Sequence, residues 1–284
     1  MSSVISAFGM LLLAIVLIAN TAVIAEPSPF HEVDVFTIGE AGYFCIKIPY
    51  LFTTFNGTML AFGEGRKESC SDFAPTDLVF KVSEDAGATW GPLRVLHTNG
   101  SNTVGNAAPL QLRSNGRILI PFCINNLYVY QMHSDDNGHT WSIPEFIPGA
   151  TQPDWQWVGT GPPGGLQLAS GRLVVPSYHS YVANTDGDIA RIHMMINDDP
   201  SGNASSWFVG GAATGIEWTN ECQAVELEPN HLLITTHGFV LPQRMQVESF
   251  DGGMTLGEPY FIDIGAPFGG CEGSIAKLNN SLLS

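Results

Sequence analysis

The sequence has little charge, and very little positive charge. Its 284 residues include 11 Lys and Arg against 27 Asp and Glu, which gives a formal net charge of -16, and only 13% of residues are charged. No cluster of Lys or Arg offsets this balance locally. Because binding to a phosphate backbone depends on basic side chains that release counterions, this composition argues against a nucleic-acid partner.

Long helices and metal-binding spacings are also missing. The 31 Gly and 18 Pro interrupt the chain too often for a helical bundle, and no stretch keeps a long 3.6-residue hydrophobic period. The five cysteines include no C-x-x-C pair and no His spacing typical of a zinc site. With 44% hydrophobic residues, the chain instead predicts an ordered all-β protein with many short strands and turns.

The start of the chain has no apolar run long enough for a comfortable membrane span. Phe8 to Ala19 is a run of 12 apolar or small residues, whereas a spanning helix needs about 20. Val23 and Ala25 then form a small-residue cleavage pattern, so we expect residues 1–25 to be a signal peptide, with an uncleaved anchor as the alternative. Four N-x-S/T sequons support the secretory pathway: Asn56, Asn99, Asn203 and Asn279. We therefore expect a secreted or lysosomal glycoprotein that has no membrane contact after cleavage.

What the sequence does contain is a repeat. A polar turn followed by an apolar run recurs five times, with spacings of 50 to 59 residues between the second turn residues Gly57, Gly116, Gly171, Asn230 and Asn280. This period fits a four-stranded blade of a β-propeller. Between the turns we expect strands at Leu78–Val82, Leu127–Met132 and Met245–Phe250.

A second motif keeps the same period. Ser83–Trp90 and Ser134–Trp141 both read S-x-D-x-G-x-T-W, and degraded copies occur at Asn197–Trp207 and Ser249–Thr255. In such a box the Asp accepts backbone amide hydrogen bonds within a hairpin, the Gly permits a positive φ, and the Trp covers the hairpin. We therefore interpret these aspartates as structural and not catalytic.

Together with further motifs, these boxes resemble the sialidases. The further motifs are Ile46–Pro49, Leu60–Arg66, Asn220–Gln223 and Gly270–Ser274. The resemblance covers roughly residues 31–284, within an expected domain of 26–284. It implies a six-bladed β-propeller with a central site, no cofactor or metal, and an exo-acting glycosidase that removes terminal sialic acid. The implied partners are sialylated glycoproteins, glycolipids or oligosaccharides.

The resemblance also implies catalytic residues. Sialidases use a Tyr nucleophile, which the family pairs with a Glu base and an Asp acid/base. By motif the acid/base is Asp72, with Asp77 as the alternative, and the base is Glu221. Cys45 and Cys70 flank segments that converge in this reading, so they are our first choice for a disulfide, although other pairings remain open.

Four further residues are candidates for substrate binding. Arg66 resembles the family's contact to the 4-hydroxyl of the sugar, and Glu64 resembles an acid that steadies the first cation. Lys47 stands where the family has its first carboxylate-binding Arg; it keeps the charge but loses the planar, bidentate fork. Tyr178 is expected to face the sugar or to be a buried core aromatic.

The chain departs from the family in two other places. Where the family has its second Arg, this chain has His237-Gly238, and Arg244 nearby reads as the start of the next strand. The repeat reaches Asn280 shortly before the last residue, so we expect a propeller that is C-terminally incomplete in this chain. On the resemblance, the third Arg and the Tyr nucleophile would follow Ser284.

Three functions therefore stay open from sequence. The leading one is a sialidase, which Arg66, Asp72 and Glu221 favour. Lys47 and His237 favour a non-catalytic sialoglycan-binding propeller. A peptide-binding receptor ectodomain is a weaker third, because the sugar-site motifs argue against it.

Overall fold

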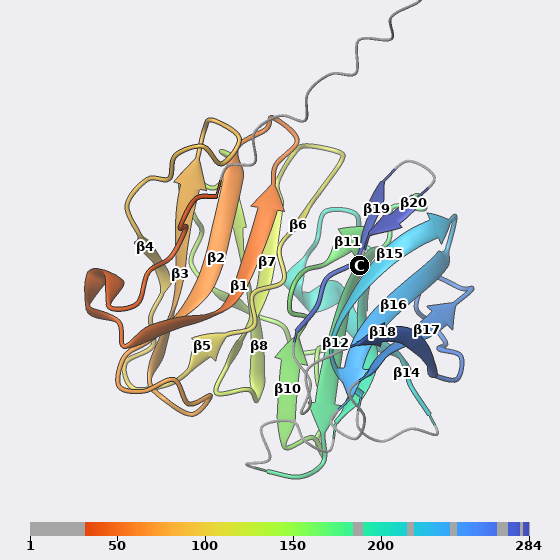
Figure 1. Ribbon diagram of the computed structural model, residues 1–284. Helices are drawn as coiled ribbons and strands as arrows, with labels where there is room; N and C mark the ends of the chain where they lie inside the picture. Colours follow the sequence, from red (N-terminus) through yellow and green to blue (C-terminus); the bar gives the residue numbers. More distant parts are fainter. Residues whose placement is uncertain are drawn as a thin grey trace, which may run out of the picture. The chain divides into compact units, whose positions relative to one another are not determined.

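The computed structural model describes residues 32–183, 190–214, 219–238, 243–265, 272–278 and 281–283. The expected signal peptide and the turn at Asn280 lie outside these residues. Strands dominate the described chain, and its helical segments are the single 3-10 turns η1 (Glu40–Gly42) and η2 (Ala204–Ser206) (Figure 1). Within the described ranges, no helix is long and apolar enough to cross a membrane. The all-β prediction is confirmed.

Four antiparallel sheets follow one another along the chain, and we call them blades 1 to 4. Blade 1 contains β1 (Cys45–Thr53), β2 (Met59–Arg66), β3 (Thr76–Ser83) and β4 (Arg94–His97). Blade 4 contains β15 (Thr219–Glu228), β16 (His231–Gly238), β17 (Gln243–Ser249) and β18 (Tyr260–Gly265). In both, sequential strands pair with their neighbours. After blade 4 comes a two-stranded ladder of β19 (Ala276–Leu278) and β20 (Ser281–Leu283).

In blades 2 and 3 the first strand is split into two short pieces that pair with the same neighbour. Blade 2 contains β5 (Val104–Gly105) and β6 (Leu110–Gln111) on β7 (Ile118–Ile124), then β8 (Tyr128–Ser134) and β9 (Glu145–Phe146). Blade 3 contains β10 (Trp157–Thr160) and β11 (Leu166–Gln167) on β12 (Leu173–Ser180), then β13 (Arg191–Asn197) and β14 (Trp207–Ala212). The segments between the pieces leave the ladder, and they supply residues to the candidate site.

The predicted turns and strands are found where the sequence repeat places them. Gly57, Gly116, Gly171 and Asn230 all have positive φ, between 63° and 96°, a conformation that Gly adopts freely and Asn tolerates. The three predicted strands correspond to β3, β8 and β17, with ends shifted by one or two residues.

The core lies between successive blades. Alternate residues of a strand point to opposite faces, so Ile118, Ile120 and Phe122 of β7 pack with blade 1, while Leu119 and Cys123 pack with blade 3. The same alternation divides β12 between the clusters shared with blades 2 and 4. Both faces of β7 and β12 are therefore buried, which explains the apolar run at the start of each of these two strands.

Each of three S-x-D boxes closes its own hairpin with the same hydrogen bonds. In the box of blade 2, Asp136 Oδ1 accepts from the Thr140 amide at 2.8 Å and Asp136 Oδ2 accepts from the Thr140 hydroxyl at 2.6 Å. Asp85 and Asp251 repeat these bonds. Burial acts to raise the pKa of Asp136, but the hydrogen bonds from Thr140 and Ser134 together outweigh it and lower that pKa to about 2.

The box tryptophan also joins neighbouring blades. Trp141 donates Nε1–H to the carbonyl of Gly138 inside its own hairpin. Its ring lies edge-on to Phe62 and Phe80 of blade 1, with centroids 6.1 and 6.2 Å apart. The aspartates thus hold the turns, and Trp141 contributes to packing between blades.

Candidate active site

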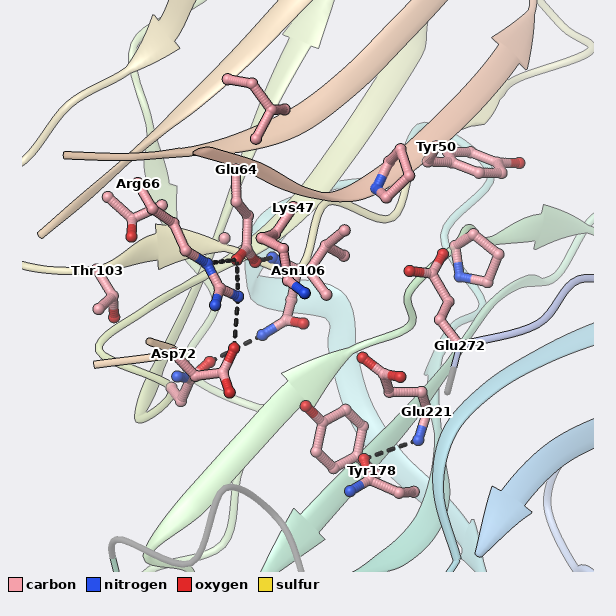
Figure 2. Close-up of a pocket in the computed structure, with 18 of the residues that line it drawn as sticks. Lys47, Tyr50, Glu64, Arg66, Asp72, Thr103, Asn106, Tyr178, Glu221 and Glu272 are labelled. Carbon is pink, nitrogen blue, oxygen red and sulfur yellow. Dashed lines mark hydrogen bonds and ion pairs between the residues drawn. The ribbon is translucent and has the colours of Figure 1, made fainter. Parts of the chain in front are cut away.

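A cavity of about 920 Å³ is lined by residues from all four blades and by the segment before β19. Its volume is in the range typical of sites for small molecules. Figure 2 shows Glu64, Arg66 and Asp72 on one side of this cavity and Tyr178, Glu221 and Glu272 on the other. The cavity brings together all six residues predicted for the site: Lys47, Glu64, Arg66, Asp72, Tyr178 and Glu221.

Arg66 is the centre of one side. It ends β2, and Glu64, two residues earlier, faces the same way because side chains alternate along a strand. Arg66 Nη2 lies 2.8 Å from Glu64 Oε2 and 2.5 Å from Asp72 Oδ1, and Nη1 donates to the Cys70 carbonyl. The Arg66 side chain is only 2% exposed, whereas that of Asp72 is 45% exposed. The buried Arg66 guanidinium therefore holds the accessible Asp72 carboxylate at the cavity.

Glu64 is held from both sides. Its Oε1 accepts from the Asn106 amide at 2.9 Å, and its Oε2 accepts from Arg66. Burial raises the pKa of Glu64, although the Arg66 charge and the hydrogen bonds from Arg66 and Asn106 act in the opposite direction. A Cβ on Gly105 would overlap the Glu64 carboxylate, so glycine at that position leaves room for this acid.

Of the two candidate acids, Asp72 lines the cavity and Asp77 does not. Asp77 lies inside β3, where its Oδ2 accepts from the Tyr43 hydroxyl at 2.8 Å and its Oδ1 pairs with Lys67 Nζ at 2.7 Å. These contacts give Asp77 a structural role. The Cys45–Cys70 disulfide is present, as preferred from sequence, and it ties the Asp72 loop to the start of β1.

Lys47 reaches the cavity from an irregular part of β1. It pairs with Glu64 across the ladder, and the register shifts between Lys47 and Tyr50. Inside this bulge Ile48 has φ 49°, which is unusual for a β-branched residue and marks local strain. The bulge replaces regular pairing at the point where β1 passes the cavity. Lys47 is exposed and makes no ion pair with any described residue.

Glu221 lies opposite, at a second irregularity. The β15–β16 register shifts between Thr219 and Cys222, and Asn220 Oδ1 accepts the Glu221 amide at 2.8 Å. The carboxylate of Glu221 contacts His237 Nε2 at 3.1 Å. His237, which stands in the region of the family's second Arg, thus faces Glu221 within the cavity. Arg244, its cross-strand neighbour, does not line the cavity.

Tyr178, which belongs to β12, lies beside Glu221 (Figure 2). It is 4% exposed, and burial followed by the Glu221 charge raises the pKa of its phenol well above its usual range. Its cross-strand partner is Gly159, where a Cβ would overlap the tyrosine ring. Tyr178 is therefore buried and also lines the cavity, and its contact with the sugar stays a prediction. Trp157 lines the cavity too, whereas Trp155 stacks on His179 with centroids 4.0 Å apart.

Sequence reasoning assigned no role to Asn106, Tyr50 or Glu272, which also line the cavity. Asn106 lies 42 residues from Glu64 in the chain and has φ 56°; no local pattern signals such a contact. Glu272 belongs to the motif Gly270–Ser274 noted in the sequence, and its carboxyl group within that motif could have indicated a place in the site.

The fold and the cavity together define a β-propeller protein with a central site built from acidic and basic side chains. Residues 123–277 match the BNR repeat-like domain family. An exo-alpha-sialidase of Aspergillus fumigatus is 30% identical over 169 residues, 48% of this chain and 42% of that protein. An exo-alpha-sialidase of Arthroderma benhamiae is 26% identical over 272 residues, 84% of this chain and 62% of that protein.

Solved structures show the same fold. The NanB sialidase of Streptococcus pneumoniae aligns with a TM-score of 0.74 at 14% identity, covering 90% of this chain and 58% of that chain. A Hadza microbial sialidase aligns with a TM-score of 0.69 at 23% identity, covering 82% and 49%. This chain belongs to the BNR repeat-like domain family, and it has the propeller fold of the sialidases that it resembles. It spans about half the length of the curated relatives it matches.

Proposed function

We propose that this protein is an exo-α-sialidase-like glycoside hydrolase that removes terminal sialic acid from glycoproteins, glycolipids or oligosaccharides. The observation that carries the proposal is the convergence of Arg66, Asp72 and Glu221 on one cavity. These residues come from β2, from the loop after it and from β15, so their meeting results from the fold and not from proximity in sequence. The names of the relatives support the substrate class.

The two sides of the cavity suit different parts of the reaction. Glycosidic cleavage passes through an oxocarbenium-like state, which needs an acid for the leaving oxygen and electrostatic stabilisation of the sugar. Asp72 is the acid/base, because its carboxyl is accessible while Arg66 fixes its position. Lys47 and Arg66 are the cations for the carboxylate and 4-hydroxyl of the sugar, and Glu64 holds Arg66 in place.

Glu221 is the base on the other side. The family resemblance assigns it a tyrosine nucleophile as partner, and its contact with His237 keeps the carboxylate oriented. Tyr178 forms the wall beneath the sugar.

The test is hydrolysis of a fluorogenic sialoside, between about pH 4 and 7, by the protein expressed from its full transcript; tuned carboxyl groups commonly operate in this pH range. Asp72→Asn and Glu221→Gln should each reduce turnover by about 100-fold or more, the usual range for loss of general acid–base catalysis. The exposed Asp263 provides a matched control, and Asp263→Asn should retain turnover. Turnover that is unchanged in both site variants would reject the assignment.

The second candidate is a sialoglycan-binding propeller without catalysis. Two observations favour it: Lys47 cannot grip a carboxylate with two parallel hydrogen bonds, and His237 occupies the side of the cavity facing Glu221. Binding on a sialoglycan array without turnover would select this function over the hydrolase.

The whole propeller, on this proposal, has six blades, which is the number that the resemblance to the sialidases implies. Residues 1–25 act as a signal peptide that directs the protein to secretion or to lysosomes. A secreted product whose N-terminal sequence begins at Glu26 would support the second statement, and a product that retains residues 1–25 would reject it. The number of blades can be counted in a structure of the protein expressed from its full transcript.

A further inference from the structure

Acidic side chains outnumber lysine and arginine among the described residues of the cavity, although the proposed ligand is an anion. Among the described residues, four carboxyl side chains line it, against one lysine, one arginine and one histidine: Glu64, Asp72, Glu221 and Glu272 against Lys47, Arg66 and His237. Asp72 and Glu64 are both paired with Arg66, which leaves Glu221 and Glu272 on the opposite side. If all four carboxyl groups were ionised, the described side chains would give the site a net negative charge. Such a site would repel the carboxylate of an anionic sugar.

Glu272 makes no ion pair with a described residue, whereas Glu64 and Asp72 pair with Arg66 and Glu221 contacts His237. Figure 2 shows its side chain between Tyr50 and Glu221, at the cavity wall. The charged and titratable groups that act on it from neighbouring elements are Glu64 of β2, Glu221 of β15 and Arg244 of β17, and it acts in turn on Tyr50 of β1. The Arg244 guanidinium packs against Gly273, where a Cβ would overlap it, and it does not line the cavity.

We propose, on the basis of the proposed function, that Glu272 meets the ligand as a neutral carboxylic acid, donates a hydrogen bond to a hydroxyl or carbonyl oxygen of the sugar, and excludes the anionic sugar once it ionises. A protonated carboxyl is a donor as well as an acceptor, so this group adds a contact that an ionised glutamate could not make.

The electrostatic environment agrees with the geometry. Burial, followed by the charges of Glu221 and Glu64, raises the pKa of Glu272 to about 8, and Arg244 opposes this shift only in part. Glu272 is therefore neutral below that pH and negative above it. Ligand binding that requires the neutral form weakens about tenfold for each unit of pH above the pKa, which predicts about tenfold weaker binding at pH 9 than at pH 6.

The first measurement needs no ligand. Carboxyl ¹³C resonances of the full chain, labelled at glutamate, are followed from pH 5 to pH 10, and Glu272→Gln identifies the resonance that disappears. Glu272→Asp, in which the same glutamate resonance also disappears, provides the assignment if the Gln variant does not fold. A midpoint near 8 supports the proposal, and a midpoint below about 6 overturns it, because the group would be ionised at neutral pH.

The second measurement compares binding of 2,3-didehydro-2-deoxy-N-acetylneuraminic acid by calorimetry at pH 6 and pH 9. The wild-type protein should bind about tenfold more weakly at pH 9, while Glu272→Gln should bind about equally at both. Glu145→Gln is the control, because Glu145 is exposed in blade 2, and it should follow the wild type.

The outcomes separate the two proposals. Binding at pH 6 with the same pH dependence in wild type and Glu272→Gln overturns the role of Glu272 and leaves the proposed function standing. Loss of binding at pH 6 in Glu272→Gln also overturns it, because an amide keeps a donor and has no charge. Absence of binding at every pH in both proteins contradicts the sialic acid site itself and overturns both.

Discussion

Removal of Arg66 tests how the acidic side of the cavity is held. Arg66→Ala leaves the buried Glu64 carboxylate without its cation and the Cys70 carbonyl without its donor. Breaking a buried ion pair by removing one partner typically lowers the free energy of unfolding by about 3–5 kcal/mol. For a domain of this size we expect the melting temperature to fall by roughly 10 °C.

The loss should depend on pH in a defined direction. Burial already raises the pKa of Glu64 in the presence of Arg66, and removing the cation raises that pKa further. The folded variant then holds the Glu64 proton more strongly than the unfolded chain does, so its stability is highest at low pH and falls as the pH rises above the ordinary glutamate value. The loss caused by Arg66→Ala should therefore be larger at pH 7 than at pH 5.

The assay is thermal and denaturant unfolding, followed by circular dichroism and tryptophan fluorescence. Arg117→Ala is the control, because Arg117 pairs with Asp135 on the surface, and exposed pairs contribute about 0–1 kcal/mol. A loss below about 1 kcal/mol for Arg66→Ala, or an equal loss at pH 5 and pH 7, would refute this account of the cluster.

Two further predictions concern the frame of the site. Asp136→Asn removes the charged acceptor of a box hairpin and should lower the free energy of unfolding by about 1 kcal/mol at pH 7. The pKa of Asp136 in the folded protein is lowered from 3.8 to about 2. Its contribution to stability is therefore present above the ordinary aspartate pKa and disappears as the pH falls through the folded value. An equal effect of Asp136→Asn at pH 7 and pH 2 in denaturant titrations would contradict this prediction. Gly159→Ala should displace Tyr178, destabilise the protein by about 1–3 kcal/mol and weaken ligand binding. Gly91→Ala is the control, because its methyl group would lie 3.5 Å from the Val82 carbonyl oxygen, and it should leave stability and binding unchanged. Thermal melting measures the stability and calorimetry the binding, and unchanged values for Gly159→Ala would contradict the prediction.

Much of the fold could be predicted because its signals are local. The turns at Gly57, Gly116 and Gly171 and the boxes that begin at Ser83 and Ser134 depend on neighbouring residues, and each lies where the repeat places it. The divided first strands of blades 2 and 3 could not be predicted, because pieces as short as β5 and β6 show no periodicity. Their position depends on pairing with β7, which is a contact between distant residues.

The candidate site divides in the same way. Motifs in the sequence indicated Arg66, Asp72 and Glu221, and the structure places them around one cavity, while their catalytic roles stay predictions. The contact of Asn106 with Glu64 and the pairing of His237 with Glu221 depend on how blades and strands meet. Such contacts join residues that share no sequence pattern, so they become visible only in three dimensions.

The most direct test of the central claim is release of free sialic acid from 3′-sialyllactose, measured for the protein expressed from its full transcript and for its Asp72→Asn variant. We expect pH-dependent release by the wild-type protein, reduced about 100-fold or more in the variant. Sialic acid release that persists at wild-type rate in Asp72→Asn would show that this cavity is not where the sugar is cleaved.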